Sequence, residues 1–277
     1  MDIEELISIV TLKKIGDNKF EGQNYKTVWG RIFGGQVLSQ SLHAAYQTVP
    51  EDRIVHSMHG YFILPGDLKE TVTYEVDNIR NGGSFTTRRV VAFQKGRAIF
   101  NMAASFQKDE EGYDHQIQKP NVLSPDLLLT DFEQAEKFKD ELAERYQIFL
   151  AAHPRVFDFK PVGTNIFLRK ENALPINHCW FRLKDKIDMP LQFHHQLLAT
   201  ASLPHRNEIA KTRAYYASLD HALWFHRDFS INDWLLYDME SPSASNSRGF
   251  ARGSIFKEDG TMIASVAQEG LMRKLKK

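Results

Sequence analysis

The chain has 277 residues, and hydrophobic residues make up 42% of them, which is enough for a substantial core. The 35 basic residues balance the 35 acidic ones, so no general positive field exists that would hold nucleic acid or an anionic membrane. No apolar run approaches the roughly 20 residues that cross a bilayer, so no membrane insertion is expected. The composition excludes collagenous and disordered chains and favours a globular protein.

The single cysteine and the residues at the two chain ends indicate in which cellular compartment the protein works. Cys179 has no second cysteine with which to form an internal disulfide. The N-terminal MDIEELISIV is acidic where a secretory signal would carry basic residues, and the C-terminal RKLKK is not a Ser-Lys-Leu-type peroxisomal signal. We therefore expect a reducing compartment, with the cytoplasm as the location.

The first half of the chain predicts a helix followed by antiparallel strands. Gly34 and Gly35 precede an amphipathic segment, 36–46, whose apolar residues recur at helical spacing. Strands with period-two alternation are expected over 70–77, 84–94 and 98–107, with turns at 81–83 and 95–96.

The second half repeats this order. The helix-like segment is 196–201, the strands are 234–240, 247–256 and 262–272, and the turns are 242–246 and 259–260. Tyr61 matches Trp224, and Ser84 matches Ser247, both at an offset of 163 residues. A shared offset indicates duplication. The alternative is one irregular α+β domain without duplication.

The residues between the two halves read as a linker with one or two helices. Residues 108–119 are charged and loop-like, and Thr130 and Glu133 have capping-box spacing ahead of a helix. The apolar residues of that helix would be Ala135, Phe138, Leu142 and Phe149.

We thus predict an α+β chain with two hot-dog units, each a long helix along a curved antiparallel sheet. The expected boundaries are 1–110 for the N-terminal hot-dog unit, 111–175 for the helical linker and 176–277 for the C-terminal hot-dog unit. Ligands would lie where the two units meet.

The motifs of several enzyme classes are absent. The sequence has no GxSxG elbow, GxxxxGK[ST] loop, HExxH pair or GxGxxG turn. The pair Gly34-Gly35 has two interpretations. It relieves crowding between the helix and its neighbours, or it leaves helix N-terminal N–H groups open to polarise a ligand carbonyl.

The eleven histidines do not predict a metal site. His194 and His195 would diverge by about 100° on a helix, and His221 and His226 have opposite parity on a strand. A packing or hydrogen-bonding role is expected for His56 and His59.

Gln268 is the more informative polar residue, because it continues an inward row of the last strand, after Met262, Ala264 and Val266. It either lies where the row has reached solvent, or supplies an amide that holds a water or a substrate carbonyl in an apolar pocket. Ser218, a small hydroxyl in an otherwise bulky strand, has the same two interpretations.

At this point the sequence resembles the acyl-CoA thioesterase II family, a double hot-dog family of bacteria and peroxisomes. In the first half the resemblance rests on residues 31–36 (RIFGGQ), 55–62 (VHSMHGYF), 65–67, 84–85, 88–90 and 103–107 (AASFQ). In the second half it rests on residues 219–221, 224–227 (WFHR), 234–237, 243–245, 248–250 and 268–273 (QEGLMR). Only the linker around residues 110–180 differs from the family pattern.

The resemblance implies hydrolysis of fatty acyl-CoA to free acid and CoA, without a cofactor. In the family, an Asp near the second helix, a Ser or Thr two residues before an Asp-His pair and a Gln on the last strand bind one water. Ser218 and Gln268 occupy two of these positions, and Leu203 stands where the Asp is expected. A positioned general base contributes on the order of 10²–10⁴ in rate, and leucine cannot act as one.

Three outcomes follow from Leu203. Glu208 or another acid replaces the carboxylate, the enzyme is slow, or the chain is a degenerate acyl-CoA-binding protein with little or no hydrolase activity. Hydratase chemistry on this fold would need a converging imidazole and carboxylate, and no spacing indicates such a pair.

The resemblance also suggests ligand and subunit contacts. The substrate would be acyl-CoA, whose phosphates need local cations, and the candidates are Arg88, Arg89 and Arg248. By analogy with the family we expect a homodimer or homotetramer.

Overall fold

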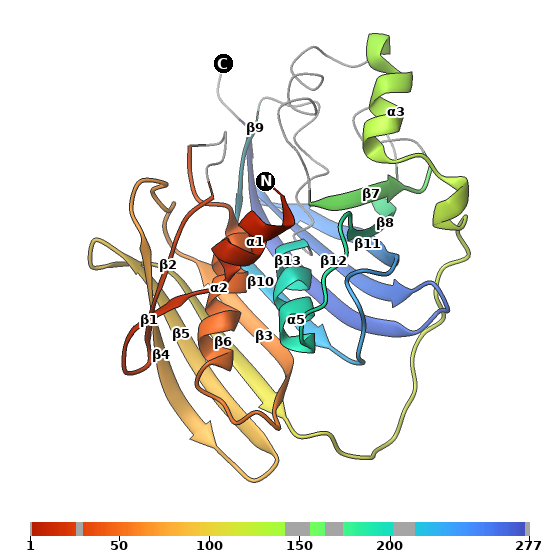
Figure 1. Ribbon diagram of the computed structural model, residues 1–277. Helices are drawn as coiled ribbons and strands as arrows, with labels where there is room; N and C mark the ends of the chain where they lie inside the picture. The colour runs from red at the N-terminus through yellow and green to blue at the C-terminus, as the bar shows by residue number, and fades with distance from the viewer. Residues whose placement is uncertain (1, 26–29, 142–155, 164–173, 202–213, 275–277) are drawn as a thin grey trace.

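The computed structural model describes residues 2–25, 30–141, 156–163, 174–201 and 214–274 (Figure 1). The helices are Ile3–Val10 (α1), Gly34–Tyr46 (α2), Asp131–Lys137 (α3) and Leu191–Ala201 (α5), with 3-10 turns at Pro125–Leu127 (η1) and Lys139–Glu141 (η2). The strands before the linker are Lys13–Gly16 (β1), Lys19–Gly22 (β2), Ile54–Phe62 (β3), Val72–Asn81 (β4), Phe85–Gln94 (β5) and Arg97–Gln107 (β6). The later strands are Phe157–Pro161 (β7), Ile176–Leu183 (β8), Ala214–Ser218 (β9), Asp220–Phe225 (β10), Leu235–Ser245 (β11), Arg248–Lys257 (β12) and Met262–Lys274 (β13).

The described strands form one antiparallel sheet. Its N-terminal half and its C-terminal half have corresponding strand orders when each is counted outward from the centre, where β3 pairs with β10. The order is β1-β2-β4-β5-β6-β3-β10-β13-β12-β11-β8-β7, and β9 pairs with β13. At its centre, Ser57 lies opposite Trp224 and Tyr61 opposite Asp220. Adding the predicted offset of 163 to residues 57 and 61 gives 220 and 224, so the two central strands exchange under that offset. The structure therefore confirms the duplication and overturns the irregular single-domain alternative.

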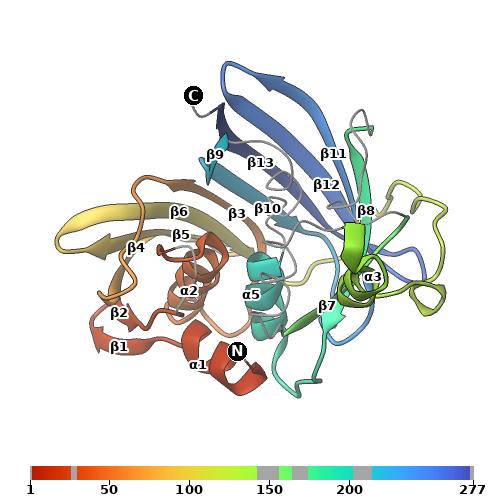
Figure 2. The same ribbon diagram turned by 90° about the horizontal axis from the view of Figure 1, so that it is seen from above.

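Helices α2 and α5 lie side by side on the concave face of the sheet (Figures 1 and 2). Almost all of α2 is buried, because the sheet, α5 and α1 each cover part of it. Helix α1 buries Leu6 and Val10, and the side chain of Gln40 on α2 donates to the carbonyl oxygen of Ile9 at 2.6 Å. Each unit is thus a helix held in a curved sheet, as the hot-dog arrangement requires.

The predicted elements agree with the observed ones except at one hairpin and at the linker helix, where α3 ends at Lys137, before Phe138. A turn was expected over 242–246, but β11 continues to Ser245 and the chain reverses at Asn246 and Ser247. Both turn residues have positive φ, 46° and 58°, as a tight two-residue hairpin turn requires. Pro242 is accommodated within β11 because the strand register shifts there.

The segment between the units contains a short helix and an additional edge strand. Thr130 and Glu133 form the predicted capping box at the start of α3. Leu142 and Phe149, expected on the same helix, lie outside the described residues. Strand β7, which the sequence patterns did not predict, pairs with β8 at the edge of the sheet. No helix in the described part of the chain is long and apolar enough to span a membrane.

Candidate active site

A β-bulge places the predicted site residues on one face of the sheet. Ser218 pairs with Gly270, and Ala222 pairs with Ala267, so residues 219–221 lie opposite only residues 268 and 269. One additional residue reverses the alternation of a strand. Ser218 and His221, three residues apart, therefore face the same side, and it is the side that Gln268 faces.

This face is the interior one. His221, Leu223 and Phe225 alternate along β10 and are all buried, and the ring of Phe225 lies 4.6 Å from the ring of His195 on α5. Gln268 is only 1% exposed. The sequence interpretation in which Gln268 points inward is thus confirmed, and the strand-end interpretation is wrong.

Gln268 is hydrogen-bonded to His221. The Nδ1 atom of His221 lies 2.9 Å from Oε1 of Gln268, and the imidazole is also 1% exposed. Because an amide oxygen only accepts, this contact is a hydrogen bond in the tautomer of His221 that carries its proton on Nδ1. His221 was not among the predicted site residues, although it belongs to the Asp-His pair, 220–221, on which the family resemblance partly rests.

Asp220 has a structural role at the bulge. Its Oδ1 atom accepts a hydrogen bond of 2.7 Å from the backbone N–H of Glu269, and the N–H of Leu219 donates to the carbonyl oxygen of Glu269 at 3.0 Å. Asp220 lies opposite Tyr61, in the outer row of the sheet. Its carboxylate therefore fixes the bulge from the outer face.

The same outer face of the sheet has a pocket over β3, β10, β12 and β13. This pocket of about 200 Å³ is bordered by His59, Tyr61, Ala222, Phe250 and Ala267 of the outer row, and it reaches Gln268 and His221 from behind. His59 also packs edge-to-face on Trp224 at 4.9 Å, which agrees with the packing role predicted for it.

The start of α2 approaches the strand that carries Ser218. Arg31 donates to the carbonyl oxygen of Tyr216 at 2.9 Å and to the hydroxyl of Tyr215 at 3.0 Å. A Cβ on Gly35 would lie 2.7 Å from the carbonyl oxygen of Thr200, so glycine is required where α2 meets the end of α5. The steric interpretation of the glycine pair is confirmed for Gly35.

The N-terminus of α2 has no side-chain cap within the described residues, since its N-cap residue is Phe33. Backbone N–H groups of a first helical turn attract an oxygen that carries negative charge. Whether they meet a ligand carbonyl in this chain stays a prediction. Leu203 and Glu208, the positions that concern the missing carboxylate, lie outside the described residues.

Of the three arginines considered for CoA phosphates, Arg88 is excluded by its contacts. It is 1% exposed, and its guanidinium donates to the hydroxyl and carbonyl oxygens of Thr48, the carbonyls of Arg80 and Thr87 and the side chain of Asn81. These bonds occupy all five N–H groups, so the prediction for Arg88 was wrong. Arg89 forms an ion pair with Asp77, and Arg248 forms one with Glu269.

The adjacent histidines of α5 have different partners, as their predicted divergence requires. The Nε2 atom of His194 donates to the carbonyl of Met189, and its Nδ1 accepts from the N–H of Ile231. Nδ1 of His195 is hydrogen-bonded to the Tyr46 hydroxyl at 2.9 Å, and burial lowers the pKa of His195 to about 3. Both histidines stabilise the helix packing.

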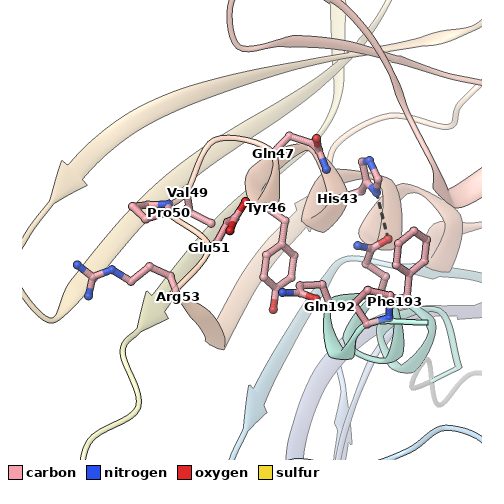
Figure 3. A pocket seen from close by; sticks show the side chains of 11 residues that line it. His43, Tyr46, Gln47, Val49, Pro50, Glu51, Arg53, Gln192 and Phe193 are labelled. Atoms are coloured by element: carbon pink, nitrogen blue, oxygen red, sulfur yellow. Dashed lines mark hydrogen bonds between the residues drawn. The ribbon is translucent and has the colours of Figure 1, made fainter. Parts of the chain in front are cut away.

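A second pocket lies at the other end of the helix pair (Figure 3). It has a volume of about 190 Å³ and lies between the C-terminal end of α2 and the N-terminal end of α5. His43 and Gln196 are hydrogen-bonded across it at 3.3 Å, and Tyr46, Gln192 and Phe193 line it. Helices α2 and α5 are equivalent helices of the two repeats. The start of α2, near Ser218, meets the end of α5, and this pocket lies where the start of α5 meets the end of α2, so it is the counterpart of the site beside Ser218.

In the N-terminal unit, the positions equivalent to Ser218, His221 and Gln268 carry no polar side chains. The N-terminal unit has the same irregularity, because the register between β3 and β6 shifts between Val55 and Ser57. The residues equivalent to positions 218, 221, 268 and 270 are all apolar and buried: Val55, Met58, Ala104 and Phe106. At these equivalent positions, the C-terminal unit has a hydroxyl and an amide and the N-terminal unit has neither.

Comparison with known proteins gives the family. The profile described as "Acyl-CoA thioesterase" matches residues 175–271, and the profile "Acyl-CoA thioesterase N-terminal domain" matches residues 25–107. The chain is 35% identical to acyl-CoA thioesterase 2 of Haemophilus influenzae, over 98% of both chains. The chain belongs to the acyl-CoA thioesterase II family. Family membership makes it an enzyme that hydrolyses thioester bonds.

Two further relatives support the family assignment and the fold. Acyl-coenzyme A thioesterase 8 of Homo sapiens is 34% identical over 96% of this chain and 88% of its own. The crystal structure of the acyl-CoA thioesterase II TesB2 from Mycobacterium marinum superposes with a TM-score of 0.78 at 34% identity, covering 97% of this chain and 98% of that one. The family fold is therefore the double hot-dog described above.

Proposed function

We propose that the chain hydrolyses fatty acyl-CoA to free fatty acid and CoA with a water held by Ser218 and Gln268. The observation that carries this proposal is the buried amide of Gln268 on the same interior face as Ser218, beside the start of α2. A buried polar side chain costs free energy unless it is hydrogen-bonded, and Gln268 keeps an amide beside His221 in a strand row whose preceding residues, Ala264 and Val266, are apolar.

The reaction needs no covalent enzyme intermediate. The water oxygen bonds to the thioester carbonyl carbon, the C–S bond breaks, and a water proton ends on the CoA sulfur. Ser218 and Gln268 orient the water, while first-turn N–H groups of α2 stabilise the negative charge that develops on the carbonyl oxygen.

Leu203 decides how fast this reaction runs. The resemblance places it where the family has an aspartate, and neither Ser218 nor Gln268 is a base at neutral pH. We therefore expect a slow hydrolase. The second candidate, motivated by the same leucine, is an acyl-CoA-binding protein with little or no hydrolase activity.

The test is a free-thiol assay on Gln268→Ala and Ser218→Ala, with thermal unfolding as the folding control. Loss of the amide is expected to lower kcat on the order of 10²-fold or more, because such donors contribute this much in comparable sites. Folded Gln268→Ala protein with an unchanged rate would refute the proposed site. A wild-type protein that binds acyl-CoA by calorimetry but releases no thiol would establish the second candidate.

We further propose the boundaries and the assembly. The units are residues 1–110 and 176–277, and the linker 111–175 adds β7 to the edge of the second unit's sheet. A cytoplasmic homodimer or homotetramer follows by analogy with other double hot-dog chains. Light scattering of the purified chain measures its mass, and a monomer would contradict the proposed assembly.

A further inference from the structure

We infer that His221 is a positioning residue that fixes which end of the Gln268 amide meets the reacting water. The inference rests on the proposed function, because it assigns a role to a neighbour of Gln268. Its basis is the hydrogen bond of 2.9 Å between Nδ1 of His221 and Oε1 of Gln268, both of which belong to fully buried side chains.

The duplicated unit shows that the fold does not require a polar pair at this place. On β3 and β6 the equivalent residues are Met58 and Ala104, which lie opposite each other and are 0% and 2% exposed. One fold position thus holds an apolar pair in the N-terminal unit and an imidazole–amide pair in the C-terminal unit. Burying two polar side chains costs free energy that an apolar pair avoids. The polar pair accompanies Ser218, which indicates that it serves the site.

The chemistry of the pair sets the direction of the amide. A glutamine side chain presents an acceptor oxygen at one end and a donor nitrogen at the other, and rotation by about 180° exchanges them. In the tautomer that carries its proton on Nδ1, His221 accommodates only the oxygen. With Oε1 held on the imidazole, Nε2 points away from it and donates to the oxygen of the attacking water. A lone pair of that water then faces the thioester carbon, and Ser218 on the same face accepts one of its protons in a hydrogen bond.

The backbone holds His221 in place for this task. The bulge that turns His221 toward Gln268 is fixed by Asp220, which accepts from the N–H of Glu269, the residue next to Gln268. Both members of the pair are therefore fixed through one short stretch of paired backbone. A misplacement of about 1 Å in such a group can cost on the order of 10²-fold in rate.

The experiment compares His221→Leu with His221→Asn. Asparagine places an N–H donor near the position of Nδ1, whereas leucine fills the space without a donor. We expect His221→Leu to lower kcat by about tenfold or more with KM changed by less than about threefold, and His221→Asn to restore most of the rate. Met58→Leu, at the equivalent place in the other unit, is the matched control and is expected to keep the wild-type kcat.

A double variant separates positioning from general damage. If His221 acts through Gln268, His221→Leu combined with Gln268→Ala is no slower than Gln268→Ala alone. Independent, multiplying effects would overturn the inference, as would His221→Asn as slow as His221→Leu. A fully active His221→Leu beside an inactive Gln268→Ala would refute the role of His221 and leave the proposed function standing. A fully active Gln268→Ala would refute the proposed function itself.

Discussion

Arg31 joins the start of α2 to the strand that carries Ser218, because its guanidinium donates a hydrogen bond of 2.9 Å to the carbonyl oxygen of Tyr216. The two residues are 185 positions apart in the chain and come from different hot-dog units. A second donor of the same guanidinium contacts the hydroxyl of Tyr215 at 3.0 Å. The helix N-terminus and the site hydroxyl are thus held in register by one side chain.

Arg31→Ala is expected to lower kcat/KM by about tenfold, because hydrogen bonds made by a charged group contribute roughly 1.5–3 kcal/mol. Arg31→Lys keeps the charge but cannot form two hydrogen bonds with the planar geometry of a guanidinium. Its kcat/KM should therefore lie between those of the wild type and Arg31→Ala. The surface pair of Lys19 with Glu75 supplies the control, since Lys19→Ala should leave the rate unchanged. Wild-type turnover by Arg31→Ala would contradict the prediction.

Leu203→Asp is expected to raise kcat on the order of 10²–10⁴-fold, because it supplies the general base that the family position implies. Leu203→Asn has a similar shape and no basic group, so it should give no comparable gain. The measurement is thiol release at saturating acyl-CoA. Equal rates for the wild type and both variants would show that position 203 does not correspond to the family aspartate.

One substrate molecule per chain is expected to bind, because the counterpart of the site has Val55, Met58 and Ala104 in place of its polar groups. Calorimetry with a non-hydrolysable alkyl-CoA thioether measures this stoichiometry. Filling the counterpart pocket by Gln47→Trp should leave thiol release unchanged. Two thioether molecules bound per chain, or a large rate loss in Gln47→Trp, would contradict this prediction.

Acid is expected to destabilise the fold through His195. Burial lowers the pKa of His195 from its ordinary 6.5 to about 3, so below pH 6.5 the unfolded chain binds a proton that the folded chain does not. The stability that comes from a neutral His195 is fully present above pH 6.5. As the pH falls from 6.5 toward 3, the free energy of unfolding decreases by about 1.4 kcal/mol per pH unit.

Urea unfolding of the wild type and of His195→Asn between pH 4.5 and 7.5 tests this. The variant cannot take up this proton. The slope of its free energy of unfolding against pH should therefore be smaller by about 1.4 kcal/mol per pH unit, which corresponds to one proton. Burial also lowers the pKa values of His43, His56, His59 and His226, so a residual slope is expected in both proteins. Identical slopes would show that His195 does not titrate on unfolding.

The sequence alone indicated the two repeats of helix and strands and the strand row to which Gln268 belongs. Period-two alternation marked the β13 row that contains Ala264 and Val266, and within a strand this alternation decides which face a side chain meets. The common offset of 163 residues indicated the duplication that the paired central strands confirm. These properties depend on neighbours along the chain, so local patterns carry them.

Only the tertiary structure decided which residues meet. The bulge between Ser218 and Ala222 reverses the strand parity and brings His221 onto the face of Gln268, and no composition cue marks it. Arg88 looked available for a phosphate, yet Thr48, 40 positions away, and the neighbouring carbonyls use its donors. Such contacts depend on strand register and chain closure between distant segments, and these are set only when the whole sheet assembles.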